Sequence, residues 1–409
     1  MRKRIPLIIL GILALAGSVY LLPQLSSPRM ESTPTVTEMT PTSAPIPTAT
    51  SMHQPEVLPL KENTLKRNIL SAGDYLVRQQ LANGELAYQV NFLTDDRSST
   101  PSYIRLMGGT SVLYTVCRVA KDSSYCEAGD RALEHYLSNL LSDAEHFKGT
   151  CLYTNGACPL GGASITIDAI YKRWQATGSV LLGEHDLLAT AVDLGYFIAS
   201  MRRPDGGFYH SFDPHYAGTI DPNYADPTFN GEGMAALLQL YEMTGNAFWL
   251  EQAREVNDFL VTQTVTEDYG HSYGLALLAR LDKLNTSDQT YAQQIADLII
   301  AGQIRSLNPI NSSGATATKL EALASIAQAL ALSDADPERL DREIQIFTTF
   351  VQARQLPEND CNFDITAEIK ERYMGGLFAS CDDPSIRVDG LQHWVNGLTL
   401  FLEYQGMKK

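Results

Sequence analysis

The chain has 409 residues, 44% of them hydrophobic, which is enough for one large domain with a sizeable core. Its formal net charge of -16 at pH 7 excludes the broad basic surface that nucleic-acid binding requires. We therefore expect no nucleic-acid partner.

The first element in chain order is a short basic start followed by an apolar stretch. Arg2, Lys3 and Arg4 precede residues 5–22, which are uncharged and almost wholly apolar. Such a stretch is at the short end of what spans a bilayer, and the flanking charge orients its start toward the cytoplasm. Residues 1–23 are predicted to be an uncleaved signal-anchor, a single pass through the cell membrane that leaves the domain extracytoplasmic. A cleaved signal peptide, which would make the domain secreted, is the alternative.

Residues 24–60 form the next segment, which is dense in Pro, Thr and Ser and poor in large apolar residues. A segment of this composition cannot bury a core, so we predict a disordered linker between the membrane and the domain.

Six cysteines support export into an oxidising compartment. Six cysteines allow fifteen pairings. No pair has zinc-finger spacing, so disulfides are favoured over a metal site, and we expect neither a metal nor a cofactor. Proximity in sequence predicts three local disulfides: Cys117 with Cys126, Cys151 with Cys158, and Cys361 with Cys381.

Residues 61–409 are predicted to be a single all-α domain of six helical hairpins. Outer helices carry one apolar stripe, whereas inner helices such as residues 320–332 are apolar nearly all round and should be buried on every side. This alternation predicts two concentric layers with few, short strands. Outer helices are expected to begin near Glu62, Ser123, Leu181, Ala247, Asp288 and Pro337. Inner helices are expected to begin near Tyr103, Gly161, Thr228, His271, Ala315 and Ile386.

Glycine-aromatic turns follow several outer helices, as in Asp205-Gly206-Gly207-Phe208 and Met374-Gly375-Gly376-Leu377-Phe378. With six hairpins, these turns resemble the six-hairpin glycosidase superfamily of (α/α)6 toroids. That group includes glycoside hydrolases, N-acylglucosamine 2-epimerase relatives and unsaturated glucuronyl hydrolases. The resemblance is architectural, and it implies a pocket at the N-terminal ends of the inner helices.

Four inner helices open with a polar residue, a spacer, a carboxylate and then Gly or Ala. We expect the four acids, Asp168, Glu232, Glu321 and Asp389, to occupy equivalent positions around the pocket. Met107 and Tyr273 fill the slot on the other two helices. Arg105, Lys319 and Arg387 stand two residues before three of the slots, and His393 lies one turn beyond Asp389.

This rim favours glycoside chemistry, which needs one protonated acid and one carboxylate. Asp168 and Asp389 are the predicted catalytic pair, with Glu232, Glu321 and His393 as further catalytic candidates. Each acid could instead cap its own helix. The predicted substrate-binding residues are Arg105, Tyr273, Lys319, Arg387, Tyr209, His210 and Trp394.

A metal bound by His210, Asp213, His215 and Asp221 is a weaker interpretation, since their spacing is irregular. The function predicted from the sequence is a surface-tethered carbohydrate-active protein, a glycoside hydrolase or a sugar epimerase, acting as a monomer. The alternative is a non-catalytic scaffold that binds a glycan or peptide of the cell envelope.

Overall fold

A computed structural model describes residues 60–98, 102–213, 219–220, 225–302, 308–333 and 337–408. The chain divides into two units, residues 1–55 and 56–409, and every described residue belongs to the second. The predicted anchor and nearly all of the predicted linker therefore lie outside the described residues. None of the helices in the described part of the chain is long and apolar enough to cross a membrane.

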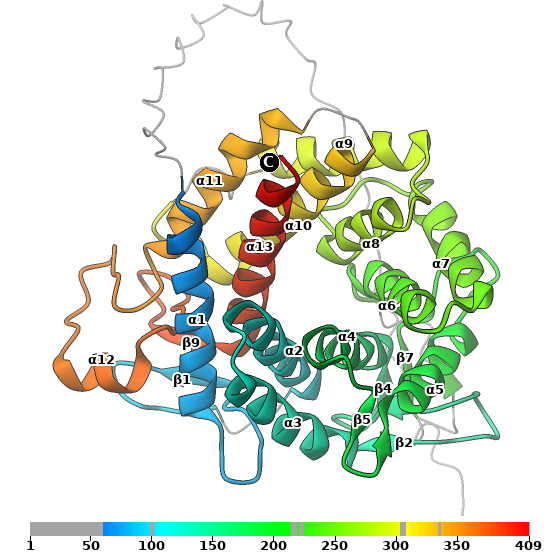
Figure 1. Cartoon of the computed structure of the whole chain (residues 1–409), viewed down its shortest axis with the longest axis horizontal. Coiled ribbons are helices and arrows are strands. Elements are labelled where there is room, and N and C mark those ends of the chain that lie inside the picture. Colours follow the sequence, from blue (N-terminus) through cyan, green and yellow to red (C-terminus); the bar gives the residue numbers. More distant parts are fainter. Residues whose placement is uncertain are drawn as a thin grey trace, which may run out of the picture. The chain divides into compact units, whose positions relative to one another are not determined.

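Six helices form an inner ring that closes on itself (Figure 1). Each packs against the next around the circle, and the last contacts the first. These inner helices are α2 (Tyr103–Ala120), α4 (Leu160–Thr177), α6 (Phe229–Thr244), α8 (Tyr269–Arg280), α10 (Ser313–Leu332) and α13 (Val388–Met407).

Six outer helices surround this ring, each preceding its inner partner in the chain. They are α1 (Glu62–Gln79), α3 (Ser123–Leu137), α5 (Leu187–Ser200), α7 (Ala247–Leu260), α9 (Thr286–Ala301) and α11 (Glu338–Gln352). The predicted toroid of six hairpins is thus the fold of the described domain. A short additional helix, α12 (Ala367–Tyr373), lies between α11 and α13.

Burial explains why the two layers differ in sequence. The outer helix α1 buries Leu65, Ile69, Ala72 and Leu76 along one face. Each of the leucine and isoleucine side chains contributes about 1.5–3 kcal/mol relative to exposure. The inner helix α10 is buried on almost every side from residue 320 to 330, because it packs against α8, α9, α11 and α13.

A short hairpin moves the start of one outer helix from the expected position. The outer helix expected near Leu181 begins six residues later, because β5 (Leu181–Leu182) pairs with β6 (His185–Asp186) in a tight hairpin. Asp186 then caps α5 by accepting from the backbone N–H groups of Leu188 and Ala189.

The strands are short, as predicted, with at most three residues each in the described part of the chain. β1 (Gln89–Asn91) pairs with β9 (Ser385–Arg387), which joins the loop after α1 to the start of α13. β4 (Cys158–Pro159) pairs with β7 (Ser211–Asp213), which pairs with β8 (Thr219–Ile220). The remaining pair is β2 (Leu140–Leu141) with β3 (Cys151–Leu152).

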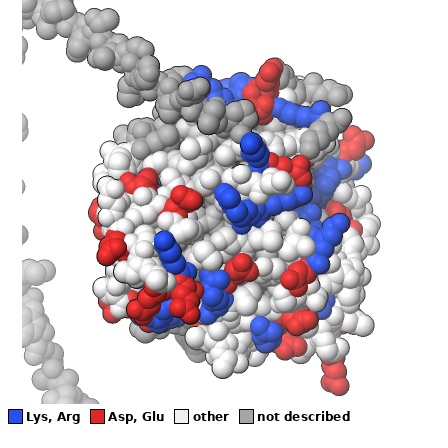
Figure 2. Space-filling view, turned by 60° about the vertical axis from the view of Figure 1, so that its left-hand side comes forward, with Lys and Arg blue, Asp and Glu red and all other residues white. Residues whose placement is uncertain are grey.

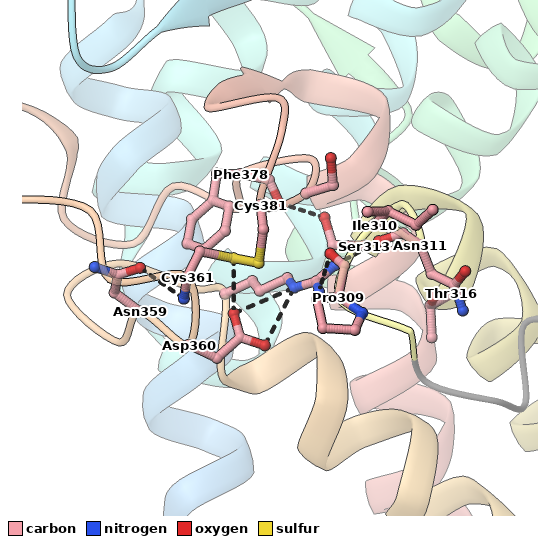
Figure 3. Close-up of polar contacts among 12 residues, drawn as sticks. Pro309, Ile310, Asn311, Ser313, Thr316, Asn359, Asp360, Cys361, Phe378 and Cys381 are labelled. Atoms are coloured by element: carbon pink, nitrogen blue, oxygen red, sulfur yellow. Dashed lines mark hydrogen bonds and ion pairs between the residues drawn. A yellow bond between two sulfur atoms is a disulfide. The ribbon is translucent and has the colours of Figure 1, made fainter.

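All three predicted disulfides are present. The Cys361–Cys381 bond lies beside Asp360, which pairs with the fully buried Arg354 (Figure 3). Arg354 also donates to the backbone carbonyls of Pro309 and Asn311. Together these contacts connect the segment before α10 to the loop that leads into α13.

On the face that carries α1 and α12, lysine and arginine side chains are interspersed with aspartate and glutamate (Figure 2). The excess negative charge of the sequence therefore does not appear there as a patch of one sign.

Candidate functional site

A pocket of about 830 Å³ opens at the N-terminal mouth of the inner ring. The starts of α2, α6, α8 and α13 supply part of its wall, and the 154–159 segment beside the Cys151–Cys158 disulfide supplies another part. The polar side chains that line it are those of Tyr88, Ser102, Arg105, Thr154, Asn155, Ser211, Asp213, Asp226, Thr228, Glu232, Tyr269, Asp389, Gln392 and His393.

A narrower cavity of about 80 Å³ lies next to this pocket, inside the pore. Ile165, Glu232, Tyr269 and Gln392 line both spaces, so these residues stand between the two. The narrow cavity reaches Arg118 and Glu403, which pair near the C-terminal ends of α2 and α13.

Glu232 is a half-buried acid at the boundary between the two spaces. Its Oε1 accepts from the hydroxyl of Tyr269 and from Thr228 Oγ1, the latter at 3.1 Å. Its Oε2 is buried and has no hydrogen-bond partner among the described residues. Burial raises the pKa of Glu232 to about 7 because an ionised carboxylate is poorly solvated there. Glu232 is therefore largely protonated just below neutral pH.

A more deeply buried acid, Asp268, lies behind Glu232. Asp268 is 3% exposed and caps α8 by accepting from the backbone N–H of His271 at 3.1 Å. Burial raises the pKa of Asp268 to about 8, and the nearby carboxyl of Glu232 raises it further by like-charge repulsion.

His393 and Glu321 form a hydrogen-bonded dyad on the opposite side of Tyr269. The Nδ1 atom of His393 lies 2.7 Å from Oε2 of Glu321. The Tyr269 ring packs edge-on against the imidazole, with 4.6 Å between ring centroids. Asn396 donates to Oε1 of Glu321 at 2.9 Å, so both carboxylate oxygens have a partner. Glu232, Tyr269, His393 and Glu321 are thus one connected cluster.

Asp389 lies at the mouth between two arginines. Arg387 Nε donates to its Oδ1 at 3.0 Å, and Arg105 Nε lies 3.3 Å from its Oδ2. Arg105 also bonds to the hydroxyl of Tyr88. Arg105, Arg387 and Asp389 therefore form one ionic cluster, and Arg105 and Asp389 line the pocket.

The expectation that the four acids occupy equivalent positions is wrong. Asp389 is the second residue of α13 and Glu232 the fourth of α6, whereas Asp168 and Glu321 are the ninth residues of their helices. Asp168 lines only the narrow cavity and Asp389 only the wide pocket. The predicted catalytic pair therefore does not share one space.

Asp168 is instead held by neighbours inside the pore. Lys172 Nζ lies 2.9 Å from its Oδ2, and Gln239 donates to its Oδ1 at 2.8 Å. Tyr273, predicted to reach substrate at the rim, also lines the narrow cavity.

Four other predicted binding residues lie away from the mouth. Lys319 pairs with Glu267 at 2.7 Å in the loop before α8. Trp394 is fully buried in the core and donates to Gln355 at 3.0 Å, which corrects its predicted contact with substrate. Tyr209 and His210 line a separate hollow of about 410 Å³ beside the Asp205-Gly206-Gly207-Phe208 turn.

The described residues do not bring together the four side chains of the weaker metal interpretation, namely His210, Asp213, His215 and Asp221. His215 and Asp221 lie outside the described residues, and Asp213 lines the pocket whereas His210 lines the separate hollow. Among described residues, Asp360, Cys361 and Cys381 lie close enough together for a metal. Their two sulfurs are bonded to each other, so they are not available as thiolate ligands.

Sequence analysis missed Asp268, Tyr269, Lys172 and Asn396. Lys172 stands four residues after Asp168 and Asn396 three after His393, and these spacings put each pair on one helix face. These spacings could have identified Lys172 and Asn396 from the sequence. No such spacing identifies Asp268, whose burial depends on the packing of α6 against α8.

No protein-family model matches the sequence, and no curated protein matches it. Solved structures do share the fold. A D-mannose isomerase superposes with a TM-score of 0.63 and 10% identity, over 84% of this chain and 98% of that one. A cellobiose 2-epimerase from Bacillus thermoamylovorans has a TM-score of 0.59 and 12% identity, over 83% and 99%.

An unsaturated glucuronyl hydrolase specific for heparin has a TM-score of 0.56 and 11% identity, over 85% of this chain and 99% of that one. At such identities the likeness concerns the fold. The resemblance to the six-hairpin glycosidase-like toroids, drawn from hairpins and glycine turns, is thereby confirmed.

Proposed function

We propose that the domain is a carbohydrate-active enzyme that moves protons to and from a sugar bound in the wide pocket. Glu232 acts as the acid, and His393, oriented by Glu321, acts as the base. The observation that carries this proposal is the connected cluster of Glu232, Tyr269, His393 and Glu321 at the floor of the pocket.

Glu232 suits the role of acid because burial raises its pKa to about 7, near the pH at which a general acid is most effective. His393 suits the role of base because its Nδ1 is turned to Glu321 in the narrow cavity. Nε2 is the ring nitrogen left for the pocket, and no described residue bonds to it.

The reaction favoured by this pair is epimerisation or isomerisation of a reducing sugar. His393 removes the proton from the carbon next to the carbonyl, while Glu232 protonates the carbonyl oxygen to give an enediol. If the enediol turns over, His393 returns the proton to the same carbon on its other face, which yields the epimer. If His393 instead returns it to the former carbonyl carbon while the neighbouring hydroxyl gives its proton to Glu232, the keto isomer results. The epimerases and isomerase that share the fold support this choice.

Glycoside hydrolysis is the second candidate, because Glu232 and Asp389 line the same pocket. A protonated acid and an ionic carboxylate are the pair that glycosidases use. Asp389 carries two arginine partners at the mouth of this pocket.

The experiment that separates these reactions is incubation of the full chain with a panel of reducing sugars and oligosaccharides in D2O, followed by NMR. Solvent deuterium next to the carbonyl supports the proposal, whereas new reducing ends without deuterium support hydrolysis. Glu232→Gln and His393→Gln should each abolish the exchange. Binding without either reaction would support the non-catalytic scaffold instead.

We further propose that residues 1–23 tether the enzyme to the outer side of the cell membrane as a monomer. The basic start and the apolar stretch support tethering. Fractionation of the full chain before and after alkaline washing is the test, and release by the wash would argue against an anchor.

A further inference from the structure

One buried amide in the pore wall, that of Gln392, has no hydrogen-bond partner among the described residues. Gln392 of α13 is 5% exposed and lines both the wide pocket and the narrow cavity. Neither its amide oxygen nor its amide nitrogen is sealed off from open space. The small part of Gln392 that remains accessible therefore includes both ends of its amide.

A neighbouring amide of the pore wall shows the usual arrangement. Asn396, one turn further along α13, donates to Glu321 at 2.9 Å and accepts from Lys172 at 2.9 Å. Buried amides are normally paired in this way, because an unpaired amide loses the hydrogen bonds that water would provide. The unpaired amide of Gln392 therefore lowers stability, and a methionine of similar size would avoid that loss.

The fold makes room for this amide at a glycine of the neighbouring helix. A Cβ built on Gly108 of α2 would come within 1.8 Å of the Gln392 Oε1 atom and 2.5 Å of its Cδ atom. An alanine at this position would thus force the amide elsewhere. Glycine is also less favourable than alanine inside a helix. Two unfavourable choices, a glycine in α2 and an unpaired glutamine in α13, therefore meet at one point of the wall.

The amide lies beside the groups proposed to carry out the reaction. Gln392 directly precedes His393 in α13, and α13 lies across the ring from α6, which carries Glu232. Glu232, like Gln392, lines both spaces. A sugar that reaches His393 and Glu232 at once spans the pore where Gln392 also lies. It would then meet the open amide.

We propose that Gln392 is a substrate-binding residue, whose amide holds two neighbouring hydroxyls of the sugar. A carboxamide presents an NH2 donor and a C=O acceptor side by side, so one hydroxyl accepts from the first while the next donates to the second. This assignment rests on the proposed function, which places the sugar in the wide pocket. It adds that the enzyme selects its substrate by these hydroxyls, because a site built to bond a hydroxyl rejects an analogue that lacks it.

Gln392→Met is the first test, because methionine keeps the apolar contacts of the side chain and removes the amide. The full chain is titrated with the panel of reducing sugars and oligosaccharides, and the sugar that the wild type binds most tightly is the probe. Its Kd should rise about 10-fold in the variant, which corresponds to one or two net hydrogen bonds. KM should rise by a similar factor while kcat changes little, as expected when the ground state and the transition state lose the same contact.

Monodeoxy forms of the probe identify the hydroxyls. The wild type should bind at least one of them about 10-fold more weakly than the parent sugar, whereas Gln392→Met should bind that form and the parent sugar alike. Removal of either partner then has the same effect as removal of both. If every deoxy form lost the same factor in both proteins, the amide would have no hydroxyl partner and the proposal would be overturned.

Stability provides a measurement that needs no sugar. Gln392→Met should unfold at the same urea concentration as the wild type or a higher one, because it loses no hydrogen bond. Gln328→Met is the matched control, since Gln328 of α10 is 6% exposed, donates to the Leu400 carbonyl at 2.8 Å and lines neither space. The control should unfold at lower urea and bind the sugar normally. An equal loss of stability in both variants would overturn the proposal.

Gly108→Ala tests the same contact from α2. It should weaken sugar binding as Gln392→Met does, although residue 108 itself lines neither space. Gly109→Ala is its control, because a Cβ there would meet Val388 Cγ2 at 2.4 Å, and Val388 also lines neither space. The control should lose stability and keep its affinity for the sugar.

The possible failures are distinguishable. Wild-type affinity in Gln392→Met would count against the role of Gln392 alone, whatever reaction the enzyme performs. Binding that depends on Gln392 without deuterium exchange would count against the proposed function alone. No binding of any sugar in the panel to the wild type would overturn both.

Discussion

Two carboxyl groups, the half-buried Glu232 and the buried Asp268, hold protons at a pH where exposed acids have lost them. Burial raises their pKa values to about 7 and about 8, from ordinary values of 4.5 and 3.8. The surrounding tyrosine and threonine hydroxyls donate to Glu232 but do not fully replace water. This is how a carboxyl in the pocket remains an acid near neutral pH.

The same pKa values predict a pH-dependent stability. Between about pH 4.5 and pH 7 the folded chain keeps the Glu232 proton that the unfolded chain releases, so this group lowers the free energy of unfolding as pH rises. Glu232→Gln should remove that loss. We expect the variant to gain stability relative to the wild type across this window and to show no further relative change above it. Urea unfolding at a series of pH values measures this difference.

Asp268→Asn is the companion variant, since asparagine can still cap α8. Its relative gain in stability should begin near pH 4 and continue to about pH 8. Stability curves that run parallel for the wild type and both variants would contradict the raised pKa values.

At the scale of the element, the close approach of α13 to α10 uses a residue without a side chain. Gly397 of α13 faces α10, and a Cβ built there would meet Leu320 Cγ at 2.9 Å and the backbone N of Glu321 at 3.1 Å. Gly406, on the same helix, has open space around its Cβ position. The two glycines therefore serve different purposes in one element.

Gly397→Ala should lower the free energy of unfolding by about 1–3 kcal/mol, because overpacking forces α10 and α13 apart. Gly406→Ala is the matched control and should raise stability by up to about 1 kcal/mol through helix propensity. Chemical denaturation of both variants measures the pair. Equal effects at the two positions would show that contact with α10 does not determine the outcome.

At the scale of the whole domain, the ring is closed by links between segments far apart in sequence. β1 pairs with β9, and Arg354 with the Cys361–Cys381 disulfide ties α10 to the entry of α13. These links hold Arg387, Asp389 and His393 against residues contributed by the first half of the chain.

Removal of the Cys361–Cys381 bond by a double substitution to serine should cost about 3 kcal/mol, from the chain entropy released when a loop of this length is opened. Unfolding with and without a reducing agent measures the effect. A reducing agent should destabilise the double variant only through its two remaining disulfides. If the double variant were as stable as the wild type without a reducing agent, a structural role of the Cys361–Cys381 bond would be contradicted.

The amino-acid sequence by itself determined the six hairpins, their two layers, the short strands and the three disulfides. These features depend on local information, namely apolar periodicity, glycine turns and cysteine proximity. It also singled out Glu232, His393 and Asp389, which the fold brings to one pocket.

Only the tertiary structure decided how deep each acid lies in the pore. The depth of a residue depends on where its helix begins and on how far that helix is shifted along its neighbours, and loops and capping set both. Asp168 therefore lies inside the pore beside Lys172, whereas Asp389 lies at the mouth beside two arginines. The raised pKa of Glu232 likewise follows from its burial by α8, which no pattern within α6 records.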